Sequence, residues 1–130
     1  MKLANFKDVK LEDVSVEGAK NTKIRWLISK EENAPNFAMR MFEVEKGGNT
    51  PFHKHAWEHE VFVVEGDGLF VTEWGKRPFK AGDFIFVDPQ EMHQFQNAGD
   101  SILRFLCVIP HEKKTVKTMN PFATGKANNC

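Results

Sequence analysis

Apolar and polar residues alternate in short segments along most of the chain from Lys23 onward. Such alternation is typical of β-strands that bury one face, and no stretch shows the three-and-four spacing of apolar residues that indicates a helix. Glycine-containing turns separate the segments, as in the runs KGG, GDG and AGD. The pattern therefore predicts strands over residues 23–29, 37–45, 52–57, 60–65, 69–74, 84–87, 93–96 and 102–109.

Short strands at this spacing predict an all-β sandwich or barrel. At 130 residues the chain is long enough to bury a core of its own as one domain. We divide it into an N-terminal arm or edge strand (residues 1–22), a barrel domain (residues 23–110) and a polar C-terminal tail (residues 111–130).

The last predicted strand allows its two faces to be distinguished. Arg104 is expected to point outward because it is charged, and successive strand residues point to opposite faces. By the same alternation, His93 and Phe95 share one face of their strand. The inner face of the last strand then forms an apolar wall with one thiol, made by Leu103, Phe105, Cys107 and Ile109.

The strand around Arg40 remains ambiguous. Either Met39 and Met41 or Arg40 and Phe42 could be the inward-facing set. Arg40 could contact an anionic substrate or form a salt bridge on the surface, and alternation alone does not choose between these roles.

Charge and composition narrow the choice of partners. Eighteen basic and eighteen acidic residues cancel, so the chain lacks the electropositive surface that nucleic acid or an anionic membrane requires. We therefore expect a small-molecule partner. The N-terminal run has no apolar segment typical of a signal peptide, and no run approaches membrane-spanning length, so cytoplasm is the expected location. Two cysteines, Cys107 and Cys130, are too few for a disulfide framework.

Four of the five histidines fall at two places along the chain, three within residues 53–59 and one at His93. A neutral imidazole offers a lone pair near physiological pH and is the commonest metal ligand among side chains. In a strand, His53 and His55 point to the same side, and His59 has the same parity. A fourth histidine from a distant hairpin would complete the site. The spacing predicts a mononuclear metal centre inside the barrel.

These segments resemble the two motifs of the cupins, which are double-stranded β-helix barrels of the jelly-roll type. The first motif, a glycine, an HxH pair and a later glycine, matches at Gly47, His53, His55 and Gly66. The second motif matches at Gly82, His93 and Asn97. Asp88 and Gln90 replace the proline and the glycine of this second motif, which alters a turn rather than a ligand. The resemblance covers roughly residues 36–109 and implies the cupin barrel fold.

The first cupin motif usually supplies an acidic ligand, and its position here is ambiguous. Four intervening residues point to Glu60 and three point to His59; in a regular strand Glu60 would face away from the histidines. The chain also resembles a subgroup of stand-alone bacterial cupins in which four histidines hold a divalent metal, typically manganese. That resemblance implies His53, His55, His59 and His93 as ligands of one divalent metal ion per chain. It favours manganese, then iron, while imidazole also suits zinc, nickel and copper.

Resemblance to the cupins also implies a function. In octahedral geometry four protein ligands leave two positions for substrate or oxidant, as in catalytic sites. We expect an oxidoreductase of the dioxygenase or oxidative cleavage type that acts on a small, largely apolar or aromatic molecule. A non-redox isomerase, lyase or epimerase is the alternative, although the absence of tyrosine and the shortage of inward-facing acids argue against it. A binding module without catalysis is the third possibility.

The remaining expectations concern the substrate pocket and the assembly. Trp57, between the histidines, would shape the entrance, and Cys107 is expected to be a packed core thiol rather than a nucleophile. Exposed strand edges favour pairing of subunits, and cupins commonly form a homodimer. The predicted pocket consists of Arg40, Trp57, Phe95, Phe105, Cys107 and Ile109.

Overall fold

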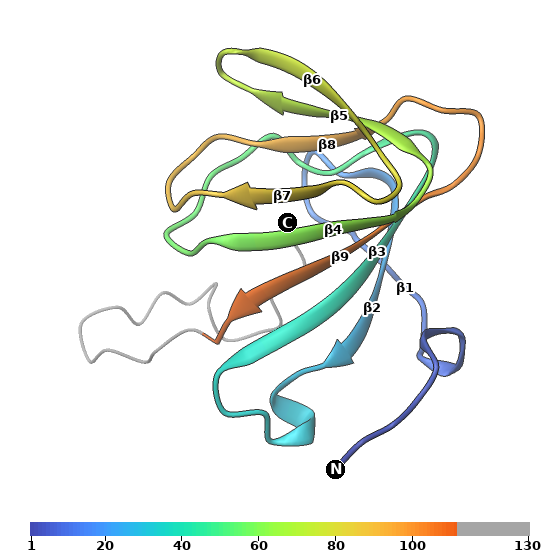
Figure 1. The fold of residues 1–130 in the computed structure, drawn as a ribbon, viewed down its shortest axis with the longest axis vertical. Coiled ribbons are helices and arrows are strands. Elements are labelled where there is room, and N and C mark those ends of the chain that lie inside the picture. Colours follow the sequence, from blue (N-terminus) through green and yellow to red (C-terminus); the bar gives the residue numbers. More distant parts are fainter. Residues whose placement is uncertain (112–130) are drawn as a thin grey trace.

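The structure, a computed structural model, describes residues 1–111 (Figure 1). It confirms the predicted all-β class. Two short 3₁₀ helices, η1 (Phe6–Asp8) and η2 (Lys30–Glu32), accompany the strands. No helix in this part of the chain has the length and apolar character needed to cross a membrane. The strands are β1 (Glu12–Asp13), β2 (Lys20–Ile28), β3 (Phe37–Asn49), β4 (His59–Glu65), β5 (Asp67–Thr72), β6 (Gly75–Lys80), β7 (Phe84–Val87), β8 (Gln94–Asn97) and β9 (Leu103–Pro110).

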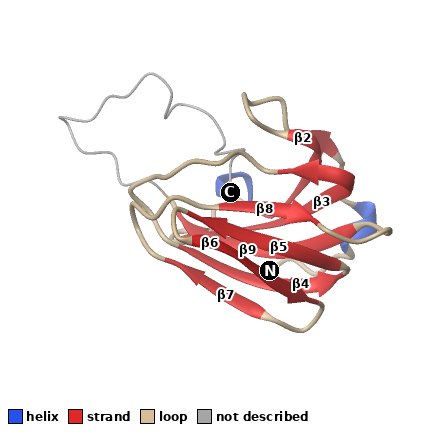
Figure 2. Cartoon of the chain, turned by 90° about the horizontal axis from the view of Figure 1, so that it is seen from above, coloured by secondary structure: helices blue, strands red, loops and turns tan. Residues whose placement is uncertain are grey.

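The strands form one antiparallel sheet that curls into a half-open barrel (Figures 1 and 2). Its strand order is β6-β5-β8-β3-β9-β4-β7, with β2 added alongside β3 and β1 alongside β2. Long β3 and β9 run side by side near the middle, in register from Phe37 opposite Pro110 to Val44 opposite Leu103. A curled sheet of this kind buries one face inside the barrel, where the core collects.

Alternation on β9 is confirmed, and the ambiguity on β3 is resolved. Leu103, Phe105, Cys107 and Ile109 are buried, and the residues between them are only partly buried. Arg40 lies opposite Cys107 and Phe42 opposite Phe105, and both are completely buried. Arg40 and Phe42 are therefore the inward-facing pair, and the surface salt bridge considered for Arg40 is wrong.

One predicted strand is absent. Residues 52–57 form a loop, and within residues 1–111 its only ladder contact is an isolated bridge between His53 and His93. The His53 amide donates to the His93 carbonyl at 3.1 Å and receives the reciprocal bond at 2.9 Å. Gln90 donates its amide to the His55 carbonyl at 2.7 Å. This loop therefore pairs with the loop before β8 and with no neighbouring strand, which is why its alternation misled the prediction.

Strand β6 was not predicted, for the opposite reason. Of its six residues only Phe79 is buried, so no apolar alternation marks the segment. Pro78, which cannot donate a backbone hydrogen bond, lies within it. Proline is tolerated here because β6 is at one end of the strand order and pairs with β5 alone among the described strands.

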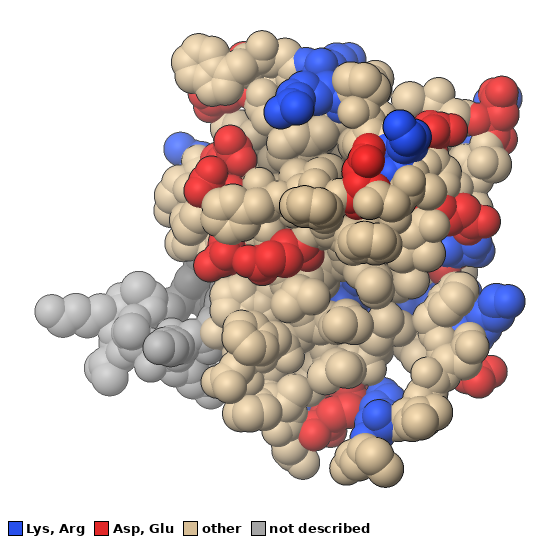
Figure 3. All heavy atoms as spheres, in the orientation of Figure 1, with Lys and Arg blue, Asp and Glu red and all other residues tan. Residues whose placement is uncertain are grey.

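An apolar region lies on the outer surface over β4 and β7. Phe62 and Val64 of β4 and Phe84 and Phe86 of β7 point away from the core and are exposed. In Figure 3 the surface over these strands is largely uncharged and is bordered by acidic side chains. The predicted polar tail, residues 111–130, lies outside the described residues apart from His111.

Candidate metal centre

Four histidines gather at one end of the barrel. His53 and His55 come from the loop before β4, His59 is the first residue of β4, and His93 directly precedes β8. His59 and His93 are almost completely buried, at 0% and 1% exposure, and His55 is 9% exposed. His53 is half-buried. The fifth histidine, His111, lies apart from the cluster, and its amide donates to the Asn36 carbonyl.

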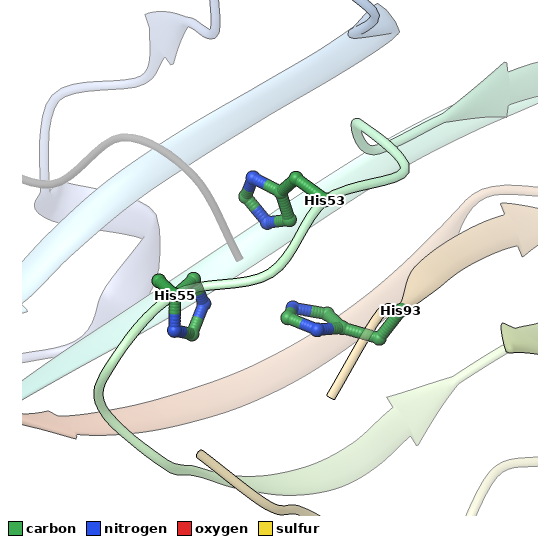
Figure 4. Close-up of side chains that lie close together, drawn as sticks. All are labelled: His53, His55 and His93. Carbon is green, nitrogen blue, oxygen red and sulfur yellow. The ribbon is translucent and has the colours of Figure 1, made fainter. Parts of the chain in front are cut away.

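Three of these rings are arranged to share one ion. One nitrogen from each of His53, His55 and His93 lies within 4.8 Å of the others. Figure 4 shows the three rings turned toward a common space. A metal–nitrogen bond of about 2.1 Å allows two donors on one ion to be up to about 4.2 Å apart. Three donors spread evenly around one ion at this bond length lie at most about 3.6 Å from one another, so shifts of less than about 1 Å would bring the three nitrogens onto a single cation.

His59 joins the same cluster from the side of β4. Its ring centroid lies 4.4 Å from that of His55 and 5.1 Å from that of His93. Nε2 of His59 lies 2.5 Å from Nε2 of His55. Two nitrogen lone pairs at this separation repel each other unless a positive charge, a proton or a metal ion, lies between or beside them. The contact has the length of a hydrogen bond from the N–H of one ring to the lone pair of the other, and it brings the two nitrogens close enough for one cation to replace that proton.

Main-chain carbonyls fix the orientation of two of the rings. Nδ1 of His55 lies 2.7 Å from the Trp57 carbonyl oxygen, and Nδ1 of His93 lies 2.8 Å from the Glu91 carbonyl oxygen. A carbonyl only accepts, so each Nδ1 carries the proton and donates it. Nε2 of each ring is then left with its lone pair toward the cluster. Metal-binding histidines have this outer partner as a rule, because it sets the tautomer and the ring angle.

The surroundings of His55 favour the neutral form of its ring. Burial, together with the neighbouring rings of His59 and His93, lowers the pKa of His55 from 6.5 to about 3. The hydrogen bond to the Trp57 carbonyl opposes this shift but is outweighed. At physiological pH His55 is therefore neutral, which is the form that ligates metal.

Glu60, the alternative ligand considered from the sequence, points the other way. Along β4 the buried residues His59, Val61 and Val63 alternate with exposed ones, and Glu60 is exposed. A hydrogen bond to Glu58, supported by partial burial, raises the pKa of Glu60 to about 7. The two carboxyl groups therefore interact with each other on the outer face of the sheet, away from the imidazole cluster.

The guanidinium of Arg40 and the thiol of Cys107, both buried, lie directly beside His59. Nη2 of Arg40 is 3.0 Å from Sγ of Cys107 and 3.4 Å from Nδ1 of His59. Sγ of Cys107 is 2.8 Å from the same Nδ1. The Arg40 guanidinium also lies over the rings of Trp26 and Phe42, at 5.6 and 5.0 Å from their centroids. Sequence reasoning placed Arg40 and Cys107 in the pocket but missed that they contact a histidine.

The other predicted pocket residues lie around the cluster. Trp57 stacks on His55, with centroids 4.3 Å apart and planes at 7°. Phe95 stacks on Phe105 at 4.7 Å and also meets the His93 ring edge-on. These two phenylalanines belong with Ile109 to the buried core, and Trp57 packs against it. The side chains thus form an apolar wall next to the histidines, and a substrate pocket among them stays a prediction.

A surface pocket of about 260 Å³ lies between the β5–β6 turn and residues 89–92, the segment that leads to His93. Trp74, 90% exposed, stands on one side of it, and Glu91, whose carbonyl orients His93, stands on the other. No residue pattern in the sequence indicates this hollow or the orienting carbonyls of Trp57 and Glu91. Both depend on main-chain atoms that every residue carries.

A family model described as "Cupin domain" matches residues 40–109. The chain is 35% identical over 95 residues to the oxalate-binding protein of Thermotoga maritima, covering 71% of this chain and 78% of that protein.

Solved structures also superpose on this chain. The polyketide cyclase RemF of Streptomyces resistomycificus superposes with a TM-score of 0.83 at 38% identity, covering 88% of this chain and 82% of that one. A predicted oxalate decarboxylase of Thermotoga maritima superposes with a TM-score of 0.75 at 26% identity, covering 84% of this chain and 98% of that one.

Proposed function

Because this chain belongs to the cupin family, we propose that it is a mononuclear metal-dependent enzyme. One divalent cation is held by the cluster of His53, His55, His59 and His93. The observation that carries the proposal is the convergence of imidazole nitrogens, with the Nδ1 atoms of His55 and His93 already donating to carbonyls. A cluster of buried neutral imidazoles is costly to assemble without a cation to share, which supports a metal-binding role.

His59 is proposed as the fourth ligand. Its Nε2 faces Nε2 of His55, and its ring is as close to His93 as the other rings of the cluster are to one another. Glu60 offers no alternative because its side chain is on the outer face of β4. An all-imidazole donor set leaves the full charge of the cation in place.

Manganese is the proposed metal, followed by iron, while zinc, nickel and copper also suit imidazole ligands. When bound, such a cation supplies a Lewis acid that polarises an oxygen of the substrate, and manganese or iron adds redox capacity. The chain's own residues supply the surroundings. Trp57 stacks on one face of His55, and Phe95, which meets His93 edge-on and stacks on Phe105, adds apolar surface next to the cluster.

For the reaction, a non-redox transformation of a small, largely apolar or aromatic molecule has the better support. The polyketide cyclase RemF shares 38% identity over most of the chain. The interior also holds Arg40 and Cys107, which are proton-bearing groups beside His59. The Cys107 thiol can carry a proton in acid–base chemistry, and the guanidinium of Arg40, which stays charged, can stabilise negative charge, so the lack of tyrosine argues less strongly against a non-redox reaction. We therefore place ring closure or a lyase-type reaction of an enolisable aromatic or polyketone compound first. The dioxygenase class predicted from sequence comes second.

The test is turnover of metal-loaded protein with aromatic polyketones and phenols, in the presence and absence of oxygen. We expect product without oxygen uptake, loss of turnover on chelation, and recovery when Mn²⁺ is returned. His111→Ala, outside the cluster, is the control and should behave like wild type. Stoichiometric oxygen uptake would instead support the oxidative class. A compound that still binds after chelation but is never converted would support a binding module, a role suggested by the oxalate-binding relative.

A further inference from the structure

His59 is held differently from the other buried rings of the cluster. His55 and His93 donate Nδ1–H to main-chain carbonyls, whereas Nδ1 of His59 faces Sγ of Cys107 at 2.8 Å. We propose that Cys107, itself held by Arg40, is the positioning residue that fixes His59 as a metal ligand through Nε2. The inference rests on the proposed function and adds to it the residue pair that completes the fourth ligand.

The direction of the hydrogen bonds supports this role. A guanidinium has donors only, so in its 3.0 Å contact with Arg40 the sulfur of Cys107 accepts. When a metal occupies Nε2 of His59, the same sulfur accepts Nδ1–H of His59 and the Nε2 lone pair binds the metal; without a metal, Nε2–H of His59 can donate to His55 instead. The reverse bond, from thiol to Nδ1, would place the ring proton on Nε2 and prevent ligation. Arg40 lies 3.4 Å from Nδ1, too far to compete with the 2.8 Å sulfur contact.

The sheet places these three residues together. Strand β9 lies between β3 and β4, and Cys107 is directly opposite Arg40 on one side and Val61 on the other. His59 is two residues before Val61, on the same inner face of β4. Diagonal neighbours on one face of a sheet are within reach of long and aromatic side chains. Arg40 is completely buried and lies over Trp26 and Phe42, so its position is fixed.

Loss of an outer partner of a metal-binding histidine typically costs about 10–100-fold in metal affinity. Cys107→Ala should therefore weaken Mn²⁺ binding by about that factor, measured by titration calorimetry. With Co²⁺ as a probe, its visible absorption should change because one imidazole is no longer held in place. Cys107→Ser, whose hydroxyl also accepts, should recover much of the affinity. Leu103→Ala, on the same strand and inner face but outside the predicted pocket, is the matched control and should leave Co²⁺ absorption unchanged.

A double-mutant cycle separates positioning from a general loss of packing. If Cys107 acts through His59, Cys107→Ala should cause no further loss of Mn²⁺ affinity in a His59→Ala background. Should Cys107→Ala fail to fold, Cys107→Val fills the space without accepting a hydrogen bond. Unchanged affinity and absorption in the folded variant, or an equal loss in the two backgrounds, would overturn the inference. Wild-type protein that binds neither Mn²⁺ nor Co²⁺ would instead contradict the proposed function.

Discussion

At the scale of single residues, the candidate centre depends on which ring nitrogen carries a proton. Carbonyls of Trp57 and Glu91 accept from Nδ1 of His55 and His93, and the sulfur of Cys107 faces Nδ1 of His59. All three arrangements direct Nε2 to the cluster. The acidic side chains nearby, Glu58 and Glu60, interact with each other on the outside of the barrel. Hydrogen bonds to the ring nitrogens, rather than nearby acidic side chains, therefore set the protonation that a cation site requires.

Substitution of His59 and Glu60 tests the choice of the fourth ligand. His59→Ala should lower Mn²⁺ affinity by more than the roughly 10–100-fold that loss of an outer partner costs. Glu60→Ala should retain wild-type affinity, because its side chain is exposed on the other face of β4. Metal analysis of both purified variants, with calorimetry, provides the measurement. If Glu60→Ala strips the metal and His59→Ala keeps it, the assignment is wrong.

The low pKa of His55 predicts how stability depends on pH. In the unfolded chain His55 returns to its ordinary pKa of 6.5, whereas in the folded protein the value is about 3. Between these values the unfolded chain binds more protons, so the free energy of unfolding falls as pH drops from about 6.5 toward 3. Well above pH 6.5 His55 is neutral in both states, so its protonation no longer makes stability depend on pH.

Urea unfolding of metal-free protein across this pH range provides the measurement. His55→Gln, which cannot take up the proton, should lose stability less steeply than wild type as the pH is lowered. Equal slopes for the two proteins would show that His55 is not held neutral by the fold.

At the scale of elements, a pair of loops positions the histidines. The loop before β4 and the loop before β8 bond to each other through His53, His93, His55 and Gln90. Gln90 adopts a left-handed backbone with φ of 65°. It stands where the cupin motif has glycine, so a residue with a side chain occupies a conformation that favours glycine. The replacement of the motif glycine by Gln90 therefore makes a strained turn, in which the Gln90 amide still donates to the His55 carbonyl.

Replacing Gln90 by glycine should stabilise the protein. A residue with a Cβ in the left-handed conformation lowers the free energy of unfolding by about 1–2 kcal/mol. Glycine avoids this cost, but it loses more backbone entropy on folding, which lowers the free energy of unfolding by about 0.5–1 kcal/mol. Gln90→Gly should thus raise the free energy of unfolding by about 0.5–1 kcal/mol in urea titrations. Gln96→Gly, in extended β8, is the control and should lower stability by about 1 kcal/mol. A Gln90→Gly variant less stable than wild type would mean that the glutamine side chain stabilises the loop.

At the scale of the whole molecule, a bound metal should stabilise the barrel. The proposed ligands come from the loop before β4, from β4 and from the residue before β8, so one cation connects segments that are distant in sequence. A ligand that binds only the folded state adds about 2.7 kcal/mol at 100 times its Kd. We expect Mn²⁺ to raise the thermal midpoint and a chelator to lower it. His93→Ala should lose the response to Mn²⁺, and His111→Ala should keep it. Equal midpoints with and without metal would argue against a site in the folded barrel.

Assembly is also decided at this scale. We expect the predicted homodimer to use the exposed apolar region of β4 and β7. Phe84 is 82% exposed, and β7 ends the strand order with β4 as its partner among the described strands. A free edge beside apolar side chains favours association. Phe84→Ser should lower the mass measured by light scattering toward that of one chain, whereas Trp74→Ser, elsewhere on the surface, should not. A monomeric wild type would contradict the expectation.

The sequence alone was sufficient for the β class and for the inner face of β9, because alternation of apolar residues has a period of two whatever the tertiary contacts. It also placed four histidines at spacings that bring donors together. Its prediction of a strand at residues 52–57 was wrong, because this segment pairs with a distant loop, and it missed the strand at 75–80, because that strand buries one side chain.

Tertiary structure alone decided which way Arg40 points, and that Arg40, Cys107 and His59 meet on three adjacent strands. It also decided which carbonyls orient the histidines. The physical reason is that pairing between distant strands and loops depends on main-chain bonds, and these carry no residue-specific signal in the sequence.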